Sequence, residues 1–216
     1  MQTVNHRHLW RVTLLLQWCY VLVGCAAAAY PLQHYEAAYT KAALETPDPD
    51  PAKLARLSQA DVARVTHGRY LVQIVGCAAC HTDGALIGEP NAARQLAGSR
   101  LGIAYTSPFQ SSYPGVAYPA NLTPDPKTGL GNWTDAQIVA AIRNGSSEDA
   151  RGHLVIMSWP LYQQMTDEDV NAIVIYLRNI PAIEDEIPKR IAPGTRASTP
   201  YVYFNVYRSG PELQIH

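Results

Sequence analysis

Apolar residues recur at helical spacing in two long segments, and a polar capping sequence precedes each of them. Ser58-Gln59-Ala60-Asp61 forms a capping box, after which apolar residues follow at steps of three and four as far as Val75. Thr166-Asp167-Glu168-Asp169 forms a second box, and the helix after it ends before Pro181. Between them, Thr134 caps a shorter helix. The pattern predicts three helices, with apolar stripes on Val62, Val65, Leu71, Val72 and Val75, on Ile138, Val139 and Ile142, and on Val170, Ile173, Val174 and Leu177.

A glycine interrupts the first of these helices. Gly68 costs about 1 kcal/mol relative to alanine inside a helix, so we expect another helix to approach it closely. Tyr176, in the last helix, is available to lie against it. In the middle helix, Gly145 stands where a C-terminal stop belongs. The glycines thus predict one tight helix crossing and one helix end.

The chain begins with a segment that is typical of export. Arg7 and Arg11 precede an apolar run over residues 12–24, and Cys25 and four alanines follow. Three fates stay open: lipidation of Cys25 in a run that resembles a bacterial lipobox, cleavage after the small residues, or retention of the segment as a membrane helix. Residues 1–29 are therefore a signal peptide or membrane anchor. We expect the rest of the chain in the periplasm, tethered to the membrane by lipidated Cys25 or by an uncleaved helix.

Residues 30–57 are expected to form a tether. Alternating prolines over residues 47–51 disfavour helix and sheet and favour an extended, semi-rigid chain. An ordered strap that lies on the following domain is the open alternative, and Tyr35, Tyr39 and Leu44 would supply its contacts.

The chemistry of the chain is concentrated at Cys77-Ala78-Ala79-Cys80-His81. The C-x-x-C-H spacing places two thiols on one side of a helical turn, where they reach the two haem vinyl groups as thioethers, and it holds His81 below the iron as proximal ligand. A zinc site would need a second ligand pair, but the other two of the four cysteines lie in the export segment. A redox dithiol would need a βαβ context, which this helical sequence lacks. We therefore predict one covalently attached haem c.

The sixth ligand of the iron has few candidates, because the chain holds three methionines. Met165 precedes the cap of the last helix and is explained as half of a hydrophobic staple. Met157 lies in an apolar loop that Pro160 keeps out of regular helix, and it is the expected distal ligand. Met165, His153 and His67 remain alternatives.

Two filled axial positions would leave no open site on the iron for a substrate. The expected chemistry is then one-electron transfer, with no catalytic residue. The rival hypothesis is a haem enzyme or a gas-binding sensor with an open iron coordination site. A formal net charge of -1 excludes a nucleic-acid binder that works through a basic face.

Residues 58–181 resemble a class I cytochrome c in the order of their motifs: a helix with a glycine, C-A-A-C-H, a middle helix, a methionine loop and a capped last helix with an aromatic. The resemblance implies an all-α fold in which helices surround one covalent haem. The export segment and extended N- and C-terminal arms would flank this domain.

Three shorter segments, residues 121–135, 157–162 and 166–170, resemble the cytochrome c modules of periplasmic alcohol, aldehyde and sugar-acid dehydrogenases. Ser158 replaces a proline that usually follows the axial methionine in that subgroup, and one haem motif stands where many relatives carry three. The resemblance implies a monohaem carrier or subunit that passes single electrons between a dehydrogenase and the respiratory chain, through an oxidase or a quinol-linked complex.

Residues 182–216 lie beyond the last predicted helix. They contain an acidic run at residues 184–186 and an aromatic cluster at residues 201–207. Because aromatic residues are enriched at interfaces, we expect this extension to act as a partner-docking arm. A strap packed on its own domain is the alternative, and the two interpretations are compatible.

Overall fold

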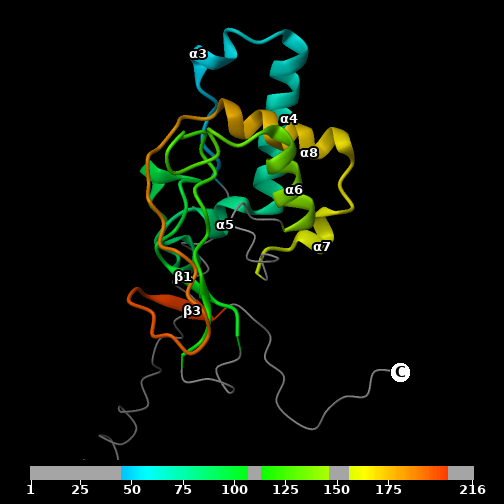
Figure 1. Ribbon diagram of the computed structural model, residues 1–216. Helices are drawn as coiled ribbons and strands as arrows, with labels where there is room; N and C mark the ends of the chain where they lie inside the picture. The colour runs from blue at the N-terminus through cyan, green and yellow to red at the C-terminus, as the bar shows by residue number, and fades with distance from the viewer. Residues whose placement is uncertain (1–44, 107–112, 146–155, 204–216) are drawn as a thin grey trace, which may run out of the picture.

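The computed structural model describes residues 45–106, 113–145 and 156–203 (Figure 1). The three helices expected from the apolar pattern are present as α4 (Gln59–Val75), α6 (Asp135–Asn144) and α8 (Asp167–Asn179). Ser58, Thr134 and Thr166 each accept a backbone N–H at their N-termini, which confirms the predicted helix starts. The other described elements are short: α3 (Pro51–Leu54), α5 (Cys77–His81), α7 (Trp159–Tyr162), the 3-10 turns η1 (Ala85–Ile87) and η2 (Ala92–Arg94), and the strands β1 (Gly102–Ala104), β2 (Val116–Ala117) and β3 (Tyr201–Tyr203).

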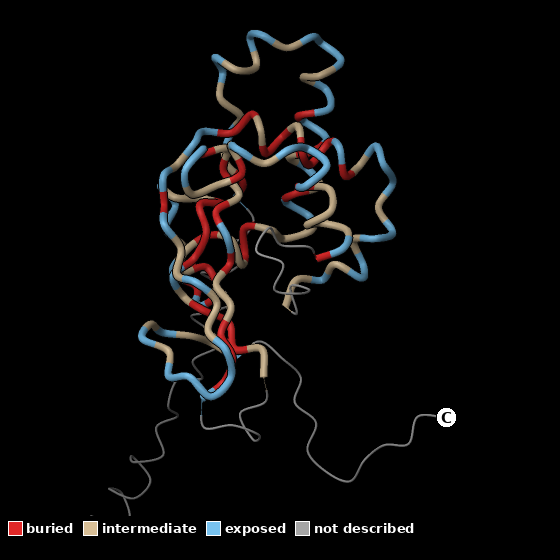
Figure 2. Tube along the Cα trace, in the orientation of Figure 1, coloured by how far each residue is buried: buried red, intermediate tan, exposed pale blue. Residues whose placement is uncertain are grey.

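The centre of the hydrophobic core is the crossing of α4 and α8 at Gly68. A Cβ atom on Gly68 would lie 1.8 Å from the carbonyl oxygen of Ala172 and 2.8 Å from the Cβ of Tyr176. The predicted close approach at this glycine, with Tyr176 against it, is therefore confirmed. Figure 2 shows buried residues where the two helices meet, and Val65 and Val72 of α4 are among them. At the end of α6, Gly145 has a φ of 61° and caps the helix as expected.

Two arginines attach α6 to α8. Arg178 of α8 pairs with Asp135 at 2.9 Å and donates to two backbone carbonyls in the turn before α6. Arg143, near the other end of α6, pairs with Asp167 at 2.6 Å and donates to the carbonyl of Met165 at 2.7 Å. These contacts place the short helix alongside the crossing of the two longer ones.

Residues 45–57 form an ordered strap on the end of α8. The Asp50 N–H donates to the carbonyl of Asn179 at 2.7 Å. The Lys53 ammonium donates to the carbonyls of Arg178 and Ile180 at 3.0 and 2.9 Å. These carbonyls lie at the C-terminal end of α8, where the negative end of the helix dipole stabilises a cation. Burial lowers the pKa of Lys53, and the Asp50 carboxylate opposes this shift. The described part of the segment is thus packed on α8. Residues 30–44 lie outside the described residues, so the choice between tether and strap stays a prediction.

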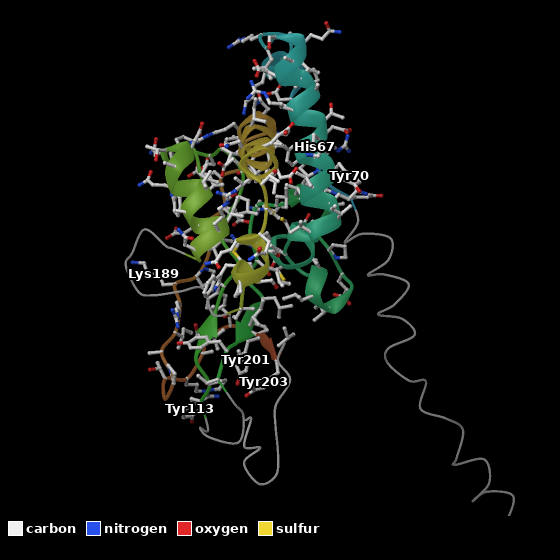
Figure 3. The ribbon with its side chains drawn as sticks, turned by 90° about the vertical axis from the view of Figure 1, so that its right-hand side faces the viewer. His67, Tyr70, Tyr113, Lys189, Tyr201 and Tyr203 are labelled. Carbon is white, nitrogen blue, oxygen red and sulfur yellow. The ribbon has the colours of Figure 1, made fainter. Side chains whose placement is uncertain are left out.

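A three-stranded sheet with the order β2-β1-β3 departs from the all-α expectation. Ile103 of β1 lies opposite Ala117 in an antiparallel pair with β2, and opposite Val202 in a parallel pair with β3. The prediction of an all-α protein is therefore correct for the helical core and wrong for this sheet. Because β1 and β3 are separated by almost half of the chain, no local periodicity marks the pairing. Figure 3 shows Tyr113, Tyr201 and Tyr203 gathered at the sheet, away from His67 and Tyr70 on α4.

The segment after α8 returns along the domain to reach this sheet. Asp185 has a buried carboxylate that pairs with both Arg94 and Arg100. Farther along, Ile191 exchanges backbone hydrogen bonds with Val116 at 2.8 and 3.0 Å. The described part of the predicted C-terminal extension, residues 182–203, is consequently packed on its own domain.

The N-terminal expectations concern residues that the structure does not describe. The export segment, Cys25 and its three possible fates all lie outside the described residues. Among the residues that are described, no helix has the length and apolar character needed to cross a membrane.

Candidate haem-binding site

Helix α5 carries the two thiols of the C-x-x-C-H motif. The preceding helix ends at Gly76, whose φ of 77° turns the chain directly into α5. Cys77 and Cys80 are both free, so no disulfide joins them. Burial raises the pKa of the Cys77 thiol to about 12 and also raises that of Cys80. The pair is therefore protonated at neutral pH and lacks the lowered pKa of a redox-active dithiol.

His81 is held in the form that binds a metal. Its Nδ1 lies 2.7 Å from the carbonyl oxygen of Ala120, and a carbonyl only accepts, so Nδ1 carries the proton. Burial lowers the pKa of His81, while the Ala120 carbonyl partly opposes this shift. The imidazole is thus neutral at pH 7, with the lone pair on Nε2 available for a ligand.

These groups fit haem c better than a bare metal ion. Two unpaired thiols and a neutral imidazole with a fixed tautomer are the donors that a covalent haem requires. In the described segments, no group of three or more histidine, cysteine, aspartate or glutamate side chains is arranged to hold a metal ion. His81 would supply the proximal ligand, and Cys77 and Cys80 would supply the thioether sulfurs.

The segment after Met157 lies beside the thiols. Met157 is partly buried and stands two residues before α7. Burial raises the pKa of Tyr162 in α7, and the nearby sulfurs of Cys77 and Cys80 add to the rise. Tyr162 therefore lies near the two thiols, and Met157 stands two residues before the helix that carries it.

The alternative distal ligands have other surroundings. Met165 packs against the hydrophobic core. His67 is on the outside of α4, where its Nε2 lies 2.8 Å from Asp169 and its ring stacks on Tyr70. His153 lies outside the described residues. The structure thus brings Cys77, Cys80 and His81 together on one short helix and leaves Met157 as the distal prediction.

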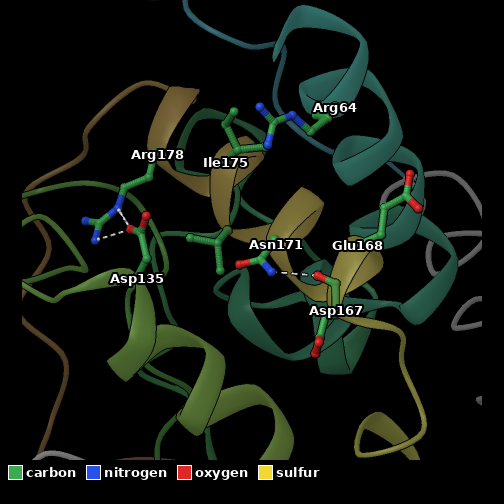
Figure 4. A pocket seen from close by; sticks show the side chains of 8 residues that line it. Arg64, Asp135, Asp167, Glu168, Asn171, Ile175 and Arg178 are labelled. Carbon is green, nitrogen blue, oxygen red and sulfur yellow. Dashed lines mark hydrogen bonds and ion pairs between the residues drawn. The ribbon is translucent and has the colours of Figure 1, made fainter. Parts of the chain in front are cut away.

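A groove beside α6 and α8 is lined by several charged side chains (Figure 4). Arg178 pairs there with Asp135, and Asn171 donates to the backbone of Asp167 at 2.7 Å. Asp167 in turn pairs with Arg143. These interactions hold the helices in place, as described above, and we assign the groove no chemical role.

The motif alone did not reveal the support behind His81. Leu96 is fully buried at a φ of 59°, a conformation that a branched side chain rarely adopts. Its N–H donates to the Thr82 hydroxyl at 3.1 Å, and its carbonyl accepts from Leu122 at 2.8 Å. The Gly98 N–H donates to the His81 carbonyl at 2.9 Å. We call residues 81–82, 96–99 and 119–123 the proximal frame.

A helical core, a C-x-x-C-H helix and a histidine with a free Nε2 define a c-type cytochrome. The family model described as "Cytochrome c" matches residues 65–181, which is more than half of the chain. The chain belongs to the cytochrome c family.

Several curated relatives are named as cytochrome subunits. The cytochrome c subunit of alcohol dehydrogenase (quinone) from Gluconacetobacter polyoxogenes is 35% identical over 57% of this chain and 23% of its own length. The fructose dehydrogenase cytochrome subunit of Gluconobacter japonicus is 31% identical over 72% of this chain and 27% of its own. The gluconate 2-dehydrogenase cytochrome c subunit of Pantoea cypripedii is 30% identical over 55% of this chain and 23% of its own length. The chain spans about a quarter of the length of these relatives.

Proposed function

We propose that this protein is a monohaem electron carrier or electron-transfer subunit. The observation that carries the proposal is the state of α5, which presents two free thiols and a neutral histidine whose Nδ1 is already bonded. A bound haem c supplies reversible one-electron transfer at its iron. The chain fixes the histidine tautomer and contributes both attachment points.

The names of the relatives support the proposed partners, and the N-terminal sequence supports the proposed compartment. The relatives are named as cytochrome subunits of alcohol, fructose and gluconate dehydrogenases. We place this chain in the periplasm, attached to the membrane through Cys25 or an uncleaved N-terminal helix. There it would accept electrons from a dehydrogenase and deliver them to an oxidase or a quinol-linked complex.

Intact mass and carbon monoxide binding test the carrier function together. The chain produced with its own N-terminal segment in a host that attaches haem c should gain the mass of one haem, and Cys77→Ser together with Cys80→Ser should abolish that gain. The reduced protein should bind carbon monoxide slowly and incompletely at neutral pH, because a sixth ligand occupies the iron. Fast and complete binding would favour the open-iron alternative, a haem enzyme or gas sensor. A chain without covalent haem would contradict both functions.

The C-terminal aromatic cluster is the proposed docking element. Because β3 pairs with β1, a deletion that begins at residue 199 would also remove a strand of the domain. A deletion of residues 204–216 leaves β3 in place and removes Phe204 and Tyr207. We expect this deletion to leave haem content unchanged and to weaken co-purification with the dehydrogenase by about tenfold, since anchor aromatics contribute most to such interfaces. Equal recovery of the partner with both chains would contradict the docking role.

A further inference from the structure

The carbonyl that bonds His81 has little support of its own. Ala120 is exposed and has only a methyl side chain, yet its oxygen must stay 2.7 Å from Nδ1 of His81. The residues on either side of it are both fixed. Pro119 accepts from the Ser99 N–H at 3.0 Å, and the side chain of Asn121 is buried at 2% exposure. The position of the Ala120 oxygen is therefore set by its neighbours.

The Asn121 amide uses its full hydrogen-bonding capacity. Its Nδ2 donates to the Thr128 hydroxyl at 3.0 Å and to the Ile183 carbonyl at 2.7 Å. Its Oδ1 accepts from the N–H of Thr123 at 2.9 Å and from the Thr123 hydroxyl at 2.7 Å. Two donors and two acceptors fit only an amide in this one orientation, which is a strong geometric constraint.

The far side of this network is the segment that follows α8. The Ile183 N–H donates to the Thr123 hydroxyl at 3.1 Å, and the Asp185 N–H donates to the Thr128 hydroxyl at 2.9 Å. Figure 1 shows this segment, in orange, running beside the green loop that precedes α6. The two arginines that pair with Asp185 hold it in place. The loop that carries Ala120 is thus fastened to a second, independently anchored segment.

The geometry points to Asn121 as a positioning residue that sets the donor strength of the proximal histidine. A histidine whose second nitrogen donates to a well-placed carbonyl is a more basic ligand, and a more basic ligand favours the oxidised iron. If the Ala120 oxygen moves away, the histidine becomes a weaker donor to the iron. The reduced state then becomes more stable relative to the oxidised state. This inference rests on the proposed haem binding and adds the residue that tunes it.

The test compares two uncharged substitutions with a matched control. Asn121→Leu removes all four bonds of the amide at similar volume, and Thr123→Val removes one hydroxyl while keeping its shape. Asn132→Leu is the control, because Asn132 is exposed and its side chain donates to the Pro126 carbonyl at 2.6 Å in the same loop, outside the proximal frame. All are made in the full chain with covalent haem.

We expect both frame variants to raise the midpoint reduction potential. At a fixed ambient potential the ratio of reduced to oxidised protein should rise about threefold to tenfold, where tenfold is ~59 mV for one electron. The hyperfine-shifted ring protons of His81 should move in the oxidised protein. The double variant should shift the midpoint potential by little more than the larger of the two single shifts, because the two side chains act in one network. Asn132→Leu should change neither the potential nor the ring signals.

Three results would overturn this role for Asn121. One is a lowered melting temperature with unchanged potential and unchanged ring signals, which would mark the network as purely structural. Another is an equal shift in Asn132→Leu. If the frame variants do not fold, proton exchange in the unaltered protein decides: the Nδ1 proton of His81 should exchange only on global unfolding, and exchange through a local opening would contradict the inference. Absence of covalent haem from the unaltered chain would instead count against the proposed function.

Discussion

A Gly68→Val substitution destabilises the haem-loaded protein by about 3 kcal/mol or more, because a Cβ at this position has no space. It would lie 1.8 Å from the backbone oxygen of Ala172, which cannot move without shifting α8. Replacement of a glycine inside a helix favours folding by about 1 kcal/mol at most. The clash is larger than this gain, so the substitution lowers the free energy of unfolding. Urea denaturation followed by far-ultraviolet circular dichroism measures the change.

Ala63→Val is the matched control, because it adds a valine to the exposed side of the same helix. We expect that change to cost less than about 1 kcal/mol, which is the range of helix propensity. A Gly68→Val protein that unfolds at the same urea concentration as the control would show that the helices separate more easily than their contact implies. It would also remove the reason for a glycine at this position.

The helical part of the fold was predictable because its signals are local. Ser58, Thr134 and Thr166 each lie within three residues of the N–H group they cap, so the sequence spacing alone identifies the helix starts. The contact of Gly68 with Tyr176 was also within reach. A glycine inside an apolar stripe allows another helix to approach closely, and Tyr176 in the last helix has a side chain that can fill the space beside it.

The sheet and the proximal frame lacked such signals. Tyr201-Val202-Tyr203 alternates as a strand does, but its partner β1 lies about a hundred residues earlier, and the aromatics favoured a docking arm instead. The Asn121 amide donates to the Ile183 carbonyl, which lies 62 residues farther along the chain, so no local pattern marks its role. Only the folded chain shows that the Ala120 carbonyl meets His81 from 39 residues away and that Asn121 is buried behind it.

Substitution of Met157 by alanine is expected to abolish the visible signature of methionine–iron coordination. Met157 is partly buried two residues before α7, and Tyr162 of that helix lies close enough to Cys77 and Cys80 for their sulfurs to raise its pKa. A thioether ligand favours the reduced iron, so its loss should also lower the reduction potential. The open position should then bind carbon monoxide fast and completely, in contrast to the unaltered protein.

Met165→Leu is the control that separates the two methionines. Met165 packs against the core and its carbonyl accepts from Arg143, and leucine preserves both the volume and the backbone bond. The control should keep the coordination signature and the slow carbon monoxide binding. If the signature survives in Met157→Ala and disappears in Met165→Leu, then the methionine before the last helix is the ligand. Met165 would then have to leave its contact with the hydrophobic core whenever haem is bound.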